Sequence, residues 1–566
     1  MRKSNYDKYP HIDLSGQLWK GWKQIISELK ARHCRLIIEC YQGVLIGEVI
    51  EAFEAEGLSV TDTRQFFKSE AEIRQMTQPW VTDDRLFGRR AGHLRMEDFI
   101  KDGIHLKEDV VIGPAASLLG PSFLLKGQTL LVYADMPRWE IQRRQRRKAV
   151  SALGVDNRDE APSKQYKRGY FVDWLVCDEL KKRLLDRIDY WLDTTRPDEP
   201  KMMTGDTIRN GLDKLSQQPF RVVPFFDPAP WGGQWMKDVC DLDKTKENFG
   251  WCFDCVPEEN SILLGEMELP ANDLVFYRTR NLLGGPVEAR FGQDFPIRFD
   301  FLDTMGGGNL SLQVHPTTEY IHDTFGIFYT QDESYYLLDA EEGATVYLGL
   351  KSDVNPDEMI GALNKAQNTG EAFDAERYVN RWPAKKHDHF LIPAGTIHCS
   401  GAGAMVLEIS ATPNIFTFKL YDWGRLGLDG LPRPINIRHG SHVIQWERQT
   451  DWVRQNIVNH IEPIAKGDGW REERTGLHEN EFIETRRHWF TKTVHHHTGG
   501  GVNVLNVIEG DELIVESPTN AFNPYVVHYA ETFIIPACVG EYTIRPHGSA
   551  EGKECGTIKA YVRFKS

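Results

Sequence analysis

Residues 309–316 read Asn-Leu-Ser-Leu-Gln-Val-His-Pro, and this stretch decides the fold assigned to the middle of the chain. Apolar and polar residues alternate along it, which predicts a short strand with one buried face. Side chains two positions apart on a strand point to the same side, so Gln313 and His315 should both project into the interior of a barrel. Pro316 then ends the strand, because proline cannot donate to a strand ladder.

Two later elements carry side chains of the kind that bind metals. Glu333 stands at the head of the strand-like run 334–338, and His398 follows the Pro/Gly turn at 393–395. Two imidazoles, a carboxylate and an amide oxygen with one open position suit zinc or a similar divalent cation. A single histidine is more often a hydrogen-bonded core or surface residue, but agreement across three separate segments favours a metal site.

The chain is β-rich from about residue 216 to its end. Short alternating strands broken by Gly, Pro and Asp predict a sandwich or barrel. Clear examples are residues 309–315, 404–409, 503–508 and 532–536. Residues 390–395 and 533–538 share a faint likeness, so two related barrels are the simplest account. One helical interruption is expected at 356–379.

The first 215 residues differ, because helical patterns there alternate with short buried strands. The expected strands are 35–39, 110–113 and 129–133. Strands separated by helices predict a parallel α/β layer. We expect a long helix over 170–191, followed by a linker over 194–204.

This α/β region faintly resembles P-loop nucleoside or sugar kinases, on the strands 36–38 and 132–137 and the helices that follow them. A phosphate cradle would need Gly-x-x-x-x-Gly-Lys-Ser/Thr. Residues 41–48 read Tyr-Gln-Gly-Val-Leu-Ile-Gly-Glu; they lack the lysine, and Glu48 would repel a phosphate. The resemblance implies a degenerate, non-catalytic kinase-like domain. The arginine run at 143–147 could bind an anion or simply be solvated.

The composition is that of an ordinary folded protein. The chain has 566 residues, a formal net charge of −15, and 41% hydrophobic and 26% charged residues. This length predicts about three to five domains, and the negative charge argues against a general binder of nucleic acid or anionic membranes. There is no apolar run long enough to span a membrane and no apolar stretch like a secretory signal near the N-terminus. Nine scattered cysteines indicate reduced thiols, so we expect a cytoplasmic protein.

Further motifs extend the metal pattern in chain order. They are Pro230-Trp231-Gly232-Gly233, Phe295-Pro296, Phe301-Leu302-Asp303, Tyr421-Asp422-Trp423-Gly424-Arg425 and Arg433-Pro434. With Gln-x-His-Pro at 313–316, Glu333, and Pro-x-Gly-x-x-His at 393–398, this ordered set resembles type I mannose-6-phosphate isomerases, metal enzymes of the cupin superfamily. The resemblance covers about residues 216–566.

The resemblance implies an activity and a set of site residues. The reaction would interconvert mannose 6-phosphate and fructose 6-phosphate through an enediol, with Zn²⁺ or another divalent metal as cofactor. The implied metal ligands are Gln313, His315, Glu333 and His398. The implied catalytic residues are Arg425, Glu408 and Asp422. An arginine suits an anionic partner, but Arg425 could instead form a salt bridge to Asp422, and both carboxylates could be structural.

Three positions depart from the family pattern. Residues 331–333 read Gln-Asp-Glu where the family usually has Lys-Pro-Glu, Ser410-Ala411 replaces Gln-Gln, and Asp300 stands where lysine is common. The missing cations keep a second hypothesis open, a non-catalytic cupin that binds a sugar or sugar phosphate as a regulator. A kinase–isomerase fusion is disfavoured, because the P-loop lysine is absent.

Two other motifs carry weaker signals. Cys252 and Cys255 form a Cys-x-x-Cys pair without a second pair at zinc-ribbon spacing, so we expect packed thiols. The run His495-His496-His497 has no acidic or cysteine partner nearby and is interpreted as an exposed or rim cluster. The C-terminal barrel is expected to hold no metal and to serve packing or assembly.

The predicted fold class is multidomain, α/β plus β. The expected division is a degenerate P-loop-kinase-like domain at 1–215, a catalytic cupin at 216–439 with a helical insertion at about 353–383, and a C-terminal cupin at 440–566. The expected partner is a small hexose phosphate, with no nucleic acid and no membrane; the oligomeric state is left open.

Overall fold

The computed structural model describes residues 4–104, 106, 108–119, 129–411, 416–427, 430, 433–476 and 478–564. The first three residues of the N-terminal stretch lie outside these ranges. The chain divides into two compact units. One, here the α/β unit, comprises His11–Leu215 and Pro257–Arg278; the other, the β unit, comprises Met1–Pro10, Ser216–Val256 and Thr279–Ser566. No helix in the described ranges is both long and apolar enough to cross a membrane.

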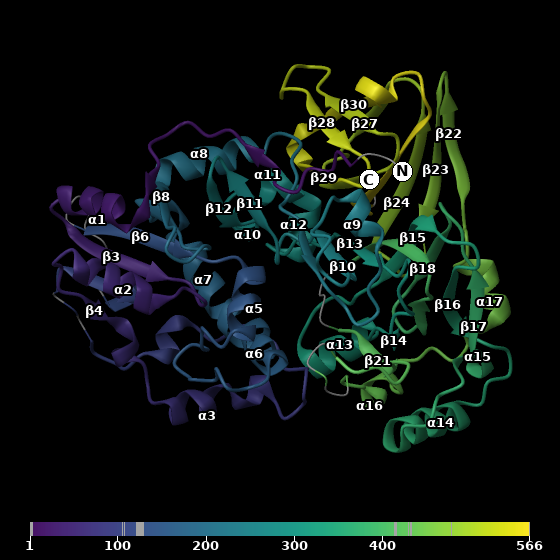
Figure 1. Ribbon diagram of the computed structural model, residues 1–566, viewed down its shortest axis with the longest axis horizontal. Coiled ribbons are helices and arrows are strands. Elements are labelled where there is room, and N and C mark those ends of the chain that lie inside the picture. The colour runs from purple at the N-terminus through teal and green to yellow at the C-terminus, as the bar shows by residue number, and fades with distance from the viewer. Residues whose placement is uncertain are drawn as a thin grey trace. The chain divides into compact units, whose positions relative to one another are not determined.

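A seven-stranded sheet forms the core of the α/β unit, in the order β2-β8-β7-β6-β3-β5-β4. Figure 1 labels β3, β4, β6 and β8 of this sheet. Its strands are β2 (Trp19–Lys20), β3 (Arg35–Cys40), β4 (Thr61–Asp62), β5 (Val110–Gly113), β6 (Thr129–Asp135), β7 (Tyr190–Asp193) and β8 (Lys201–Thr204). Five neighbouring strands pair in parallel, in the order β7-β6-β3-β5-β4. The connections between them contain helices. The parallel α/β layer and its three predicted strands are therefore confirmed.

Helices follow these strands where the sequence has helical periodicity. The main ones are α1 (Gly21–Ala31), α2 (Ile46–Ala55), α3 (Glu70–Val81), α5 (Arg138–Arg146), α6 (Pro162–Arg168), α7 (Trp174–Leu184) and α8 (Gly205–Leu215). Ile25, Ile26 and Leu29 of α1 are buried, as their spacing predicts. A small second sheet joins β1 (His11–Ile12) to the hairpin β11 (Ser261–Leu264) and β12 (Met267–Pro270), followed by α10 (Asn272–Tyr277).

Two predictions at the end of this unit are wrong. The helix expected over 170–191 ends at Arg187, and Tyr190 and Trp191 instead begin the buried strand β7. The linker expected over 194–204 is instead the turn and second strand of a hairpin, because β7 pairs antiparallel with β8. Both errors have one cause: the apolar residues of α7 run directly into those of β7, and no proline or glycine marks the boundary.

The turn after β3 is held by an arginine that belongs to the protein core. Arg144 on α5 is fully buried and donates to the carbonyl oxygens of Gly43 at 3.0 Å and Thr194 at 2.7 Å. It also pairs with Glu140 at 3.0 Å. Arg144 is therefore neither solvated nor free for a ligand, which corrects the prediction for this residue. Arg143, Arg146 and Arg147 are exposed, as the solvated interpretation expects.

Two antiparallel sheets build the middle of the β unit. The first has the order β18-β15-β20-β13-β10-β9 and the second β17-β16-β19-β14-β21. The first contains β9 (Phe225–Asp227), β10 (Trp251–Cys255), β13 (Arg298–Asp303), β15 (Glu333–Ala340), β18 (His389–Ile392) and β20 (Ala404–Ser410). The second contains β14 (Leu312–Val314), β16 (Thr345–Leu350), β17 (Val379–Pro383), β19 (His398–Ser400) and β21 (Phe418–Tyr421). Strand β14 is shorter than the alternation at 309–315 predicts.

Short helices connect these strands. They are α9 (Trp235–Val239), α11 (Thr279–Leu283), α12 (Gly285–Phe291), α13 (Thr318–Phe325), α14 (Pro356–Thr369), α15 (Ala375–Tyr378), α16 (Ile437–Gly440) and α17 (Thr450–Asn456). The expected helical interruption at 356–379 is confirmed as α14 and α15. Asn355 begins α14 by accepting a hydrogen bond from the Glu358 N–H, and Gly370 ends it in the left-handed conformation.

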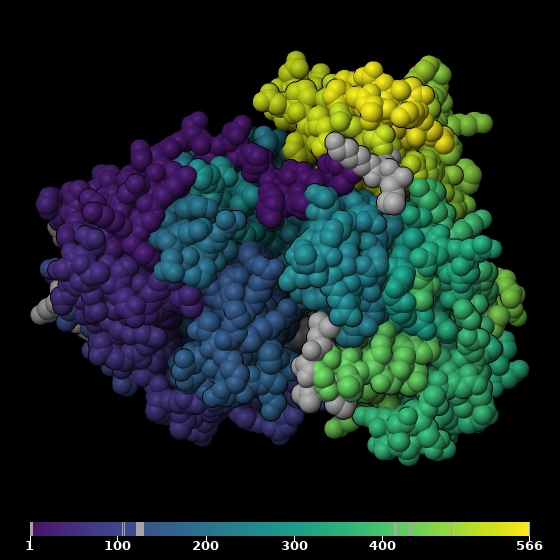
Figure 2. Space-filling view, viewed as in Figure 1, coloured from purple at the N-terminus to yellow at the C-terminus, as the bar shows by residue number. Residues whose placement is uncertain are grey.

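The C-terminal part of the β unit repeats the two-sheet plan, with orders β22-β23-β24-β31-β26-β29 and β25-β30-β27-β28. The first sheet contains β22 (Glu462–Gly467), β23 (Trp470–Gly476), β24 (Ile483–Phe490), β26 (Asn503–Glu509), β29 (Thr532–Ile535) and β31 (Cys555–Val562). The second contains β25 (Val494–His497), β27 (Glu512–Glu516), β28 (Tyr525–His528) and β30 (Glu541–Pro546). Side chains from both sheets form one core, including Leu505, Phe533, Leu513 and Tyr542. Figure 2 shows the purple N-terminal segment beside these yellow strands, where Asn5 donates to the Asp511 carbonyl at 2.9 Å.

Candidate metal centre

Facing strands of the two middle sheets bring the predicted ligands together. Gln313 lies on β14, His398 opens β19 directly opposite it, and His315 follows β14 by one residue. Glu333 opens β15 in the other sheet. Its Oε2 lies 3.0 Å from His315 Nε2 and its Oε1 lies 2.8 Å from His398 Nε2. Gln313 Nε2 lies 3.2 Å from His398 Nε2. All four side chains therefore meet at one point.

Each histidine is oriented by a backbone carbonyl. His315 Nδ1 lies 2.9 Å from the Phe416 oxygen, and His398 Nδ1 lies 2.9 Å from the Thr396 oxygen. A carbonyl at this distance fixes the proton on Nδ1 and leaves the Nε2 lone pair for a ligand bond. Both rings consequently direct Nε2 toward Glu333.

The donor set fits a divalent cation. One ligand atom each from His315, Glu333 and His398 lie within 4.8 Å of one another, and all three residues are buried. His315 Nε2 and Glu333 Oε1 have no partner with hydrogen-bond geometry among the described residues, although both are buried. Burial opposes ionisation of Glu333, but the two imidazoles outweigh it and hold the pKa of this carboxyl well below its usual range. Two neutral imidazoles, an anionic carboxylate and an amide oxygen suit zinc.

Glu408 lies beside this cluster on β20, opposite Tyr335 of β15 and Asp300 of β13. Gln331 joins it to the ligands, because its Nε2 donates to Glu333 Oε2 at 2.8 Å and contacts Glu408 Oε1 at 3.5 Å. Burial raises the pKa of Glu408 well above its usual range, and the carboxylates of Glu333 and Asp300 raise it further. Buried carboxyl groups with a raised pKa are candidates for proton transfer.

The alternative role weighed for Arg425 is present in the structure: its Nη2 lies 2.5 Å from Asp422 Oδ1. Asp422 also accepts from Ser311 Oγ at 3.0 Å and pairs through Oδ2 with Arg433 Nε at 3.0 Å. One buried carboxylate is thus shared by two arginines. The cluster keeps an excess positive charge despite the salt bridge.

Lys419 is a site residue that the sequence analysis missed. It pairs with Gln313 across β14 and β21, so both side chains project from the same face of the sheet. Burial and the nearby Arg433 lower the pKa of Lys419 to about 7, although Asp422 opposes the shift. The alternating pattern of 418–421 places Lys419 on a strand, but only the pairing with β14 places it beside a metal ligand.

The two weaker motifs have different outcomes. Cys252 and Cys255 are free, buried thiols on β10, as expected for packed residues. The interpretation of the histidine run as exposed is wrong for its central member. His495 and His497 are exposed, but β25 turns His496 inward, where its ring stacks on Tyr542 at 5.0 Å.

One family model matches the N-terminal part of the chain. Residues 21–217 match a family described as a domain of unknown function, DUF8485. The kinase-like interpretation of this region stays a prediction.

About two fifths of the chain resembles curated isomerases. Mannose-6-phosphate isomerase ManA of Bacillus subtilis (strain 168) is 24% identical over 234 residues, which is 41% of this chain and 69% of that protein. Mannose-6-phosphate isomerase of Streptococcus mutans serotype c is 27% identical over 220 residues, which is 38% of this chain and 64% of that protein.

A solved structure shares the fold. The crystal structure of the mannose 6-phosphate isomerase from Bacillus subtilis superposes with a TM-score of 0.50 at 20% identity. The match covers 61% of this chain and all of that structure. More than half of the described chain thus has the architecture of that isomerase.

Proposed function

We propose that this protein is a zinc-dependent aldose–ketose isomerase that interconverts mannose 6-phosphate and fructose 6-phosphate. The observation that carries the proposal is the convergence of Gln313, His315, Glu333 and His398 at one buried point. The relatives named mannose-6-phosphate isomerase support the choice of reaction.

These four residues would hold the cation, which supplies polarisation of the sugar carbonyl and hydroxyl oxygens. The carbonyl oxygens of Phe416 and Thr396 keep both imidazoles aimed at it. Gln331, Glu408 and the metal ligands form one connected group, so the proton-transfer candidate lies close to the oxygens that are polarised.

Glu408 is the proposed base that moves a proton between C1 and C2 of the open sugar. Repulsion from Glu333 contributes to its raised pKa, and this repulsion is offset when Glu333 ligates a cation. The pKa of Glu408 is then lowered, which makes the carboxylate form available to accept a proton.

Three cations recognise the phosphoryl group in this proposal. The departures from the family pattern remove lysines, but Lys419, Arg425 and Arg433 surround the single carboxylate of Asp422. Two arginines, and a lysine that is charged below about pH 7, outweigh the one carboxylate and leave room for an anionic substrate group. Asp422 is proposed to position the two arginines and not to touch the sugar.

The test uses the purified full chain with added zinc. We expect conversion of fructose 6-phosphate to mannose 6-phosphate and about one zinc ion per chain by elemental analysis. His315→Ala should lose both, because the remaining ligands cannot close the site. His322→Ala is the matched control, since His322 is exposed on α13 and pairs only with Asp323 among the described residues.

Two other results would redirect the proposal. Binding of a sugar phosphate with no turnover would favour the regulatory cupin, the second candidate, which the changes at 331–333 and 410–411 support. Nucleotide hydrolysis would instead point to the kinase–isomerase fusion.

The finer fold assignment is part of this proposal. We assign the middle and C-terminal β regions to two cupins, on their repeated plan of paired sheets, although hydrogen bonds among the described residues do not close either pair into one continuous barrel. We assign the α/β unit to a degenerate P-loop-kinase fold, on its parallel sheet and the glycines near β3. Cytoplasmic location is proposed from the reduced thiols.

A further inference from the structure

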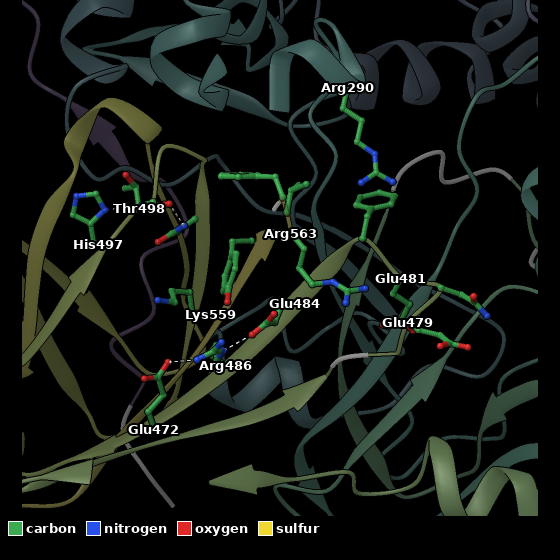
Figure 3. Close-up of a pocket in the computed structure, with 17 residues that line it drawn as sticks. Arg290, Glu472, Glu479, Glu481, Glu484, Arg486, His497, Thr498, Lys559 and Arg563 are labelled. Atoms are coloured by element: carbon green, nitrogen blue, oxygen red, sulfur yellow. Dashed lines mark hydrogen bonds and ion pairs between the residues drawn. The ribbon is translucent and has the colours of Figure 1, made fainter. Parts of the chain in front are cut away.

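A cavity of about 720 Å³ opens in the C-terminal part of the β unit (Figure 3). Its wall includes Lys559 and Tyr561 of β31, Arg486 of β24, Asn503 of β26 and Arg290 of α12. The volume lies in the range of small-molecule sites, which is roughly 300–1,000 Å³. Neither the metal ligands nor the cations around Asp422 contribute to this wall.

Lys559 is the most unusual group in the cavity. It pairs with Leu505 across β31 and β26, so its side chain shares the face that carries the core between the two sheets. Its side chain is only 8% exposed, yet Nζ makes no hydrogen bond or ion pair within the described ranges (Figure 3). Nζ also lies over the Tyr561 ring, 5.6 Å from its centroid. A buried ammonium without a hydrogen-bond acceptor is costly, so a ligand that pairs with it gains affinity.

The carboxylates near Lys559 are already engaged by arginines. Glu472 Oε1 lies 3.1 Å from Arg486 Nη1, and Glu484 contacts Arg486 and lies 3.6 Å from Arg474 Nε (Figure 3). This arrangement neutralises the acidic side chains within the sheet. The Lys559 ammonium is left to face the cavity.

Two buried histidines stand behind Lys559. The rings of His488 and His496 lie 4.5 Å apart, and these residues are 3% and 6% exposed. His488 Nδ1 and His496 Nε2 have no hydrogen-bond partner in the described part of the chain. Burial lowers the pKa of both imidazoles, and Lys559 contributes to the shift. A cation beside neutral imidazoles disfavours a metal ion and favours an anion.

The other side of the cavity carries two arginines, Arg290 and Arg563, and two carboxyl groups, Glu479 and Glu481. Burial raises the pKa of Glu481 well above its usual range, which favours its uncharged form. Arg563 donates from Nη2 to the His478 carbonyl at 2.9 Å, and its buried Nε has no partner among the described residues. Arg290 lies over the rings of Phe291 and Phe482, at 5.1 and 4.9 Å, without a carboxylate partner in the described ranges. Figure 3 shows both guanidinium groups beside the same opening.

We propose that this cavity is a second ligand site, which binds a phosphorylated small molecule with Lys559 holding the phosphoryl group. A phosphoryl group carries close to two negative charges at neutral pH and offers three acceptor oxygens, which matches several unpaired donors better than a carboxylate does. The remaining volume and the Tyr561 and Phe482 rings accommodate an organic body larger than the anion alone. The site needs neither the metal nor isomerase activity.

The test is calorimetric titration of the full chain with mannose 6-phosphate. We expect two sites in the unchanged protein and one in Lys559→Met, with affinity at the second site reduced by at least roughly tenfold, as for loss of a charged hydrogen bond. Arg425→Met should keep the Lys559 site and weaken the other. Lys553→Met is the matched control, because Lys553 is exposed in the same domain and should leave two sites.

Inorganic phosphate and mannose, titrated separately, identify the ligand chemistry. Weak binding of both at the Lys559 site supports the proposal. If inorganic phosphate binds as tightly as mannose 6-phosphate, the proposal of a ligand larger than the anion is wrong. If mannose binds as tightly as mannose 6-phosphate, the proposal that the site recognises a phosphoryl group is wrong.

A titration of Lys559→Met that matches the unchanged protein would overturn the site itself. Loss of an unpaired buried cation should leave the ligand-free melting temperature equal or higher. Lys559→Gln, which keeps a polar group in the cavity, provides the same comparison if the methionine variant does not fold. Isomerase activity and zinc content should not change in either variant, so this test is separate from that of the proposed reaction.

Discussion

Lys419 stands between the metal ligands and the cations around Asp422. Its partner across the strand pair is Gln313, and Arg425 and Arg433 lie near its ammonium group. Lys419 therefore lies between the cations proposed to bind the anionic group and the proposed site of proton transfer. Two predictions at the residue scale depend on it.

Lys419→Met should raise the KM for mannose 6-phosphate by roughly 10- to 100-fold, the effect of losing a charged hydrogen bond. The zinc content should stay unchanged, because Lys419 is not a ligand. Steady-state kinetics with metal analysis would check this. Lys351→Met, which removes an exposed lysine, should behave like the unchanged protein. An unaltered KM in the Lys419 variant would exclude this residue from substrate recognition.

The pH dependence of binding follows from the same group. Because the pKa of Lys419 is lowered to about 7, its positive charge is present below that pH and is lost above it. We expect kcat/KM to fall as the pH rises from 6 to 8. The substrate phosphate also titrates near pH 6, so the decisive measurement is the difference between the unchanged protein and Lys419→Met. Parallel profiles for the two proteins would contradict the assignment.

Local patterns could predict the ligands but not their surroundings. Gln313, His315 and His398 each stand at a strand or turn with a recognisable sequence, so their convergence could be expected. Lys419 and Gln331 become site residues only through contacts between strands distant in sequence, which no single segment specifies.

At the scale of elements, α13 stabilises the metal centre from outside. The helix begins at Thr318, after the His-Pro pair and the N-cap residue Thr317, and Gly326 ends it with φ of 69°. Its buried Phe325 packs on Phe416 at 4.9 Å, and the carbonyl of Phe416 orients His315. The helix is therefore expected to hold His315 in place as one of the proposed metal ligands.

Phe325→Ala should weaken zinc binding by roughly 10- to 100-fold, as expected when a group that orients a ligand is disturbed. The cavity should also cost about 3–5 kcal/mol of folding free energy. Competition with a zinc chelator and thermal melting would measure both effects. Phe533→Ala is the control, because Phe533 is buried in the core of the C-terminal sheets. A similar loss of zinc affinity in that variant would show a general effect of instability.

Element boundaries were harder to predict than element types. The strands at 110–113 and 404–409 have β-branched or apolar runs with clear ends, and they match β5 and β20. The predicted helix over 170–191 is too long at its C-terminal end, because Tyr190 and Trp191 continue its apolar pattern. Their pairing with β6 and β8, a long-range interaction, overrides that pattern.

At the scale of the whole molecule, a buried ion network fixes a late segment in the α/β unit. Lys181 on α7 lies 2.7 Å from Asp135 at the end of β6 and 2.8 Å from Asp273 on α10. All three side chains are almost fully buried. Asp273 lies within Pro257–Arg278, so this network joins two parts of the chain distant in sequence.

Lys181→Met should destabilise the α/β unit by roughly 3–5 kcal/mol, because it leaves two buried carboxylates without a cation. Limited proteolysis should then cut within 257–278 before it cuts the β unit. Lys164→Met, at an exposed position of α6, should melt and digest like the unchanged protein. Unchanged stability of the Lys181 variant would mean that the two carboxyl groups are protonated in the folded state.

The sequence becomes β-rich at about residue 216, but this position is not the only boundary between the two units. The segment 257–278 contains strands β11 and β12 and is surrounded by β-rich sequence, so its composition gives no sign that it belongs to the α/β unit. The three-part division of the chain stays a prediction on this account.

The chain passes from one unit to the other at residues 10, 215, 256 and 278, and this routing has a consequence for biosynthesis. On the ribosome, where residues are added at roughly 5–20 per second, the α/β unit receives its final strands only after residue 278 has emerged. Its maturation must therefore overlap in time with synthesis of the β unit, and no single proteolytic cut or gene fission can separate the two as intact halves.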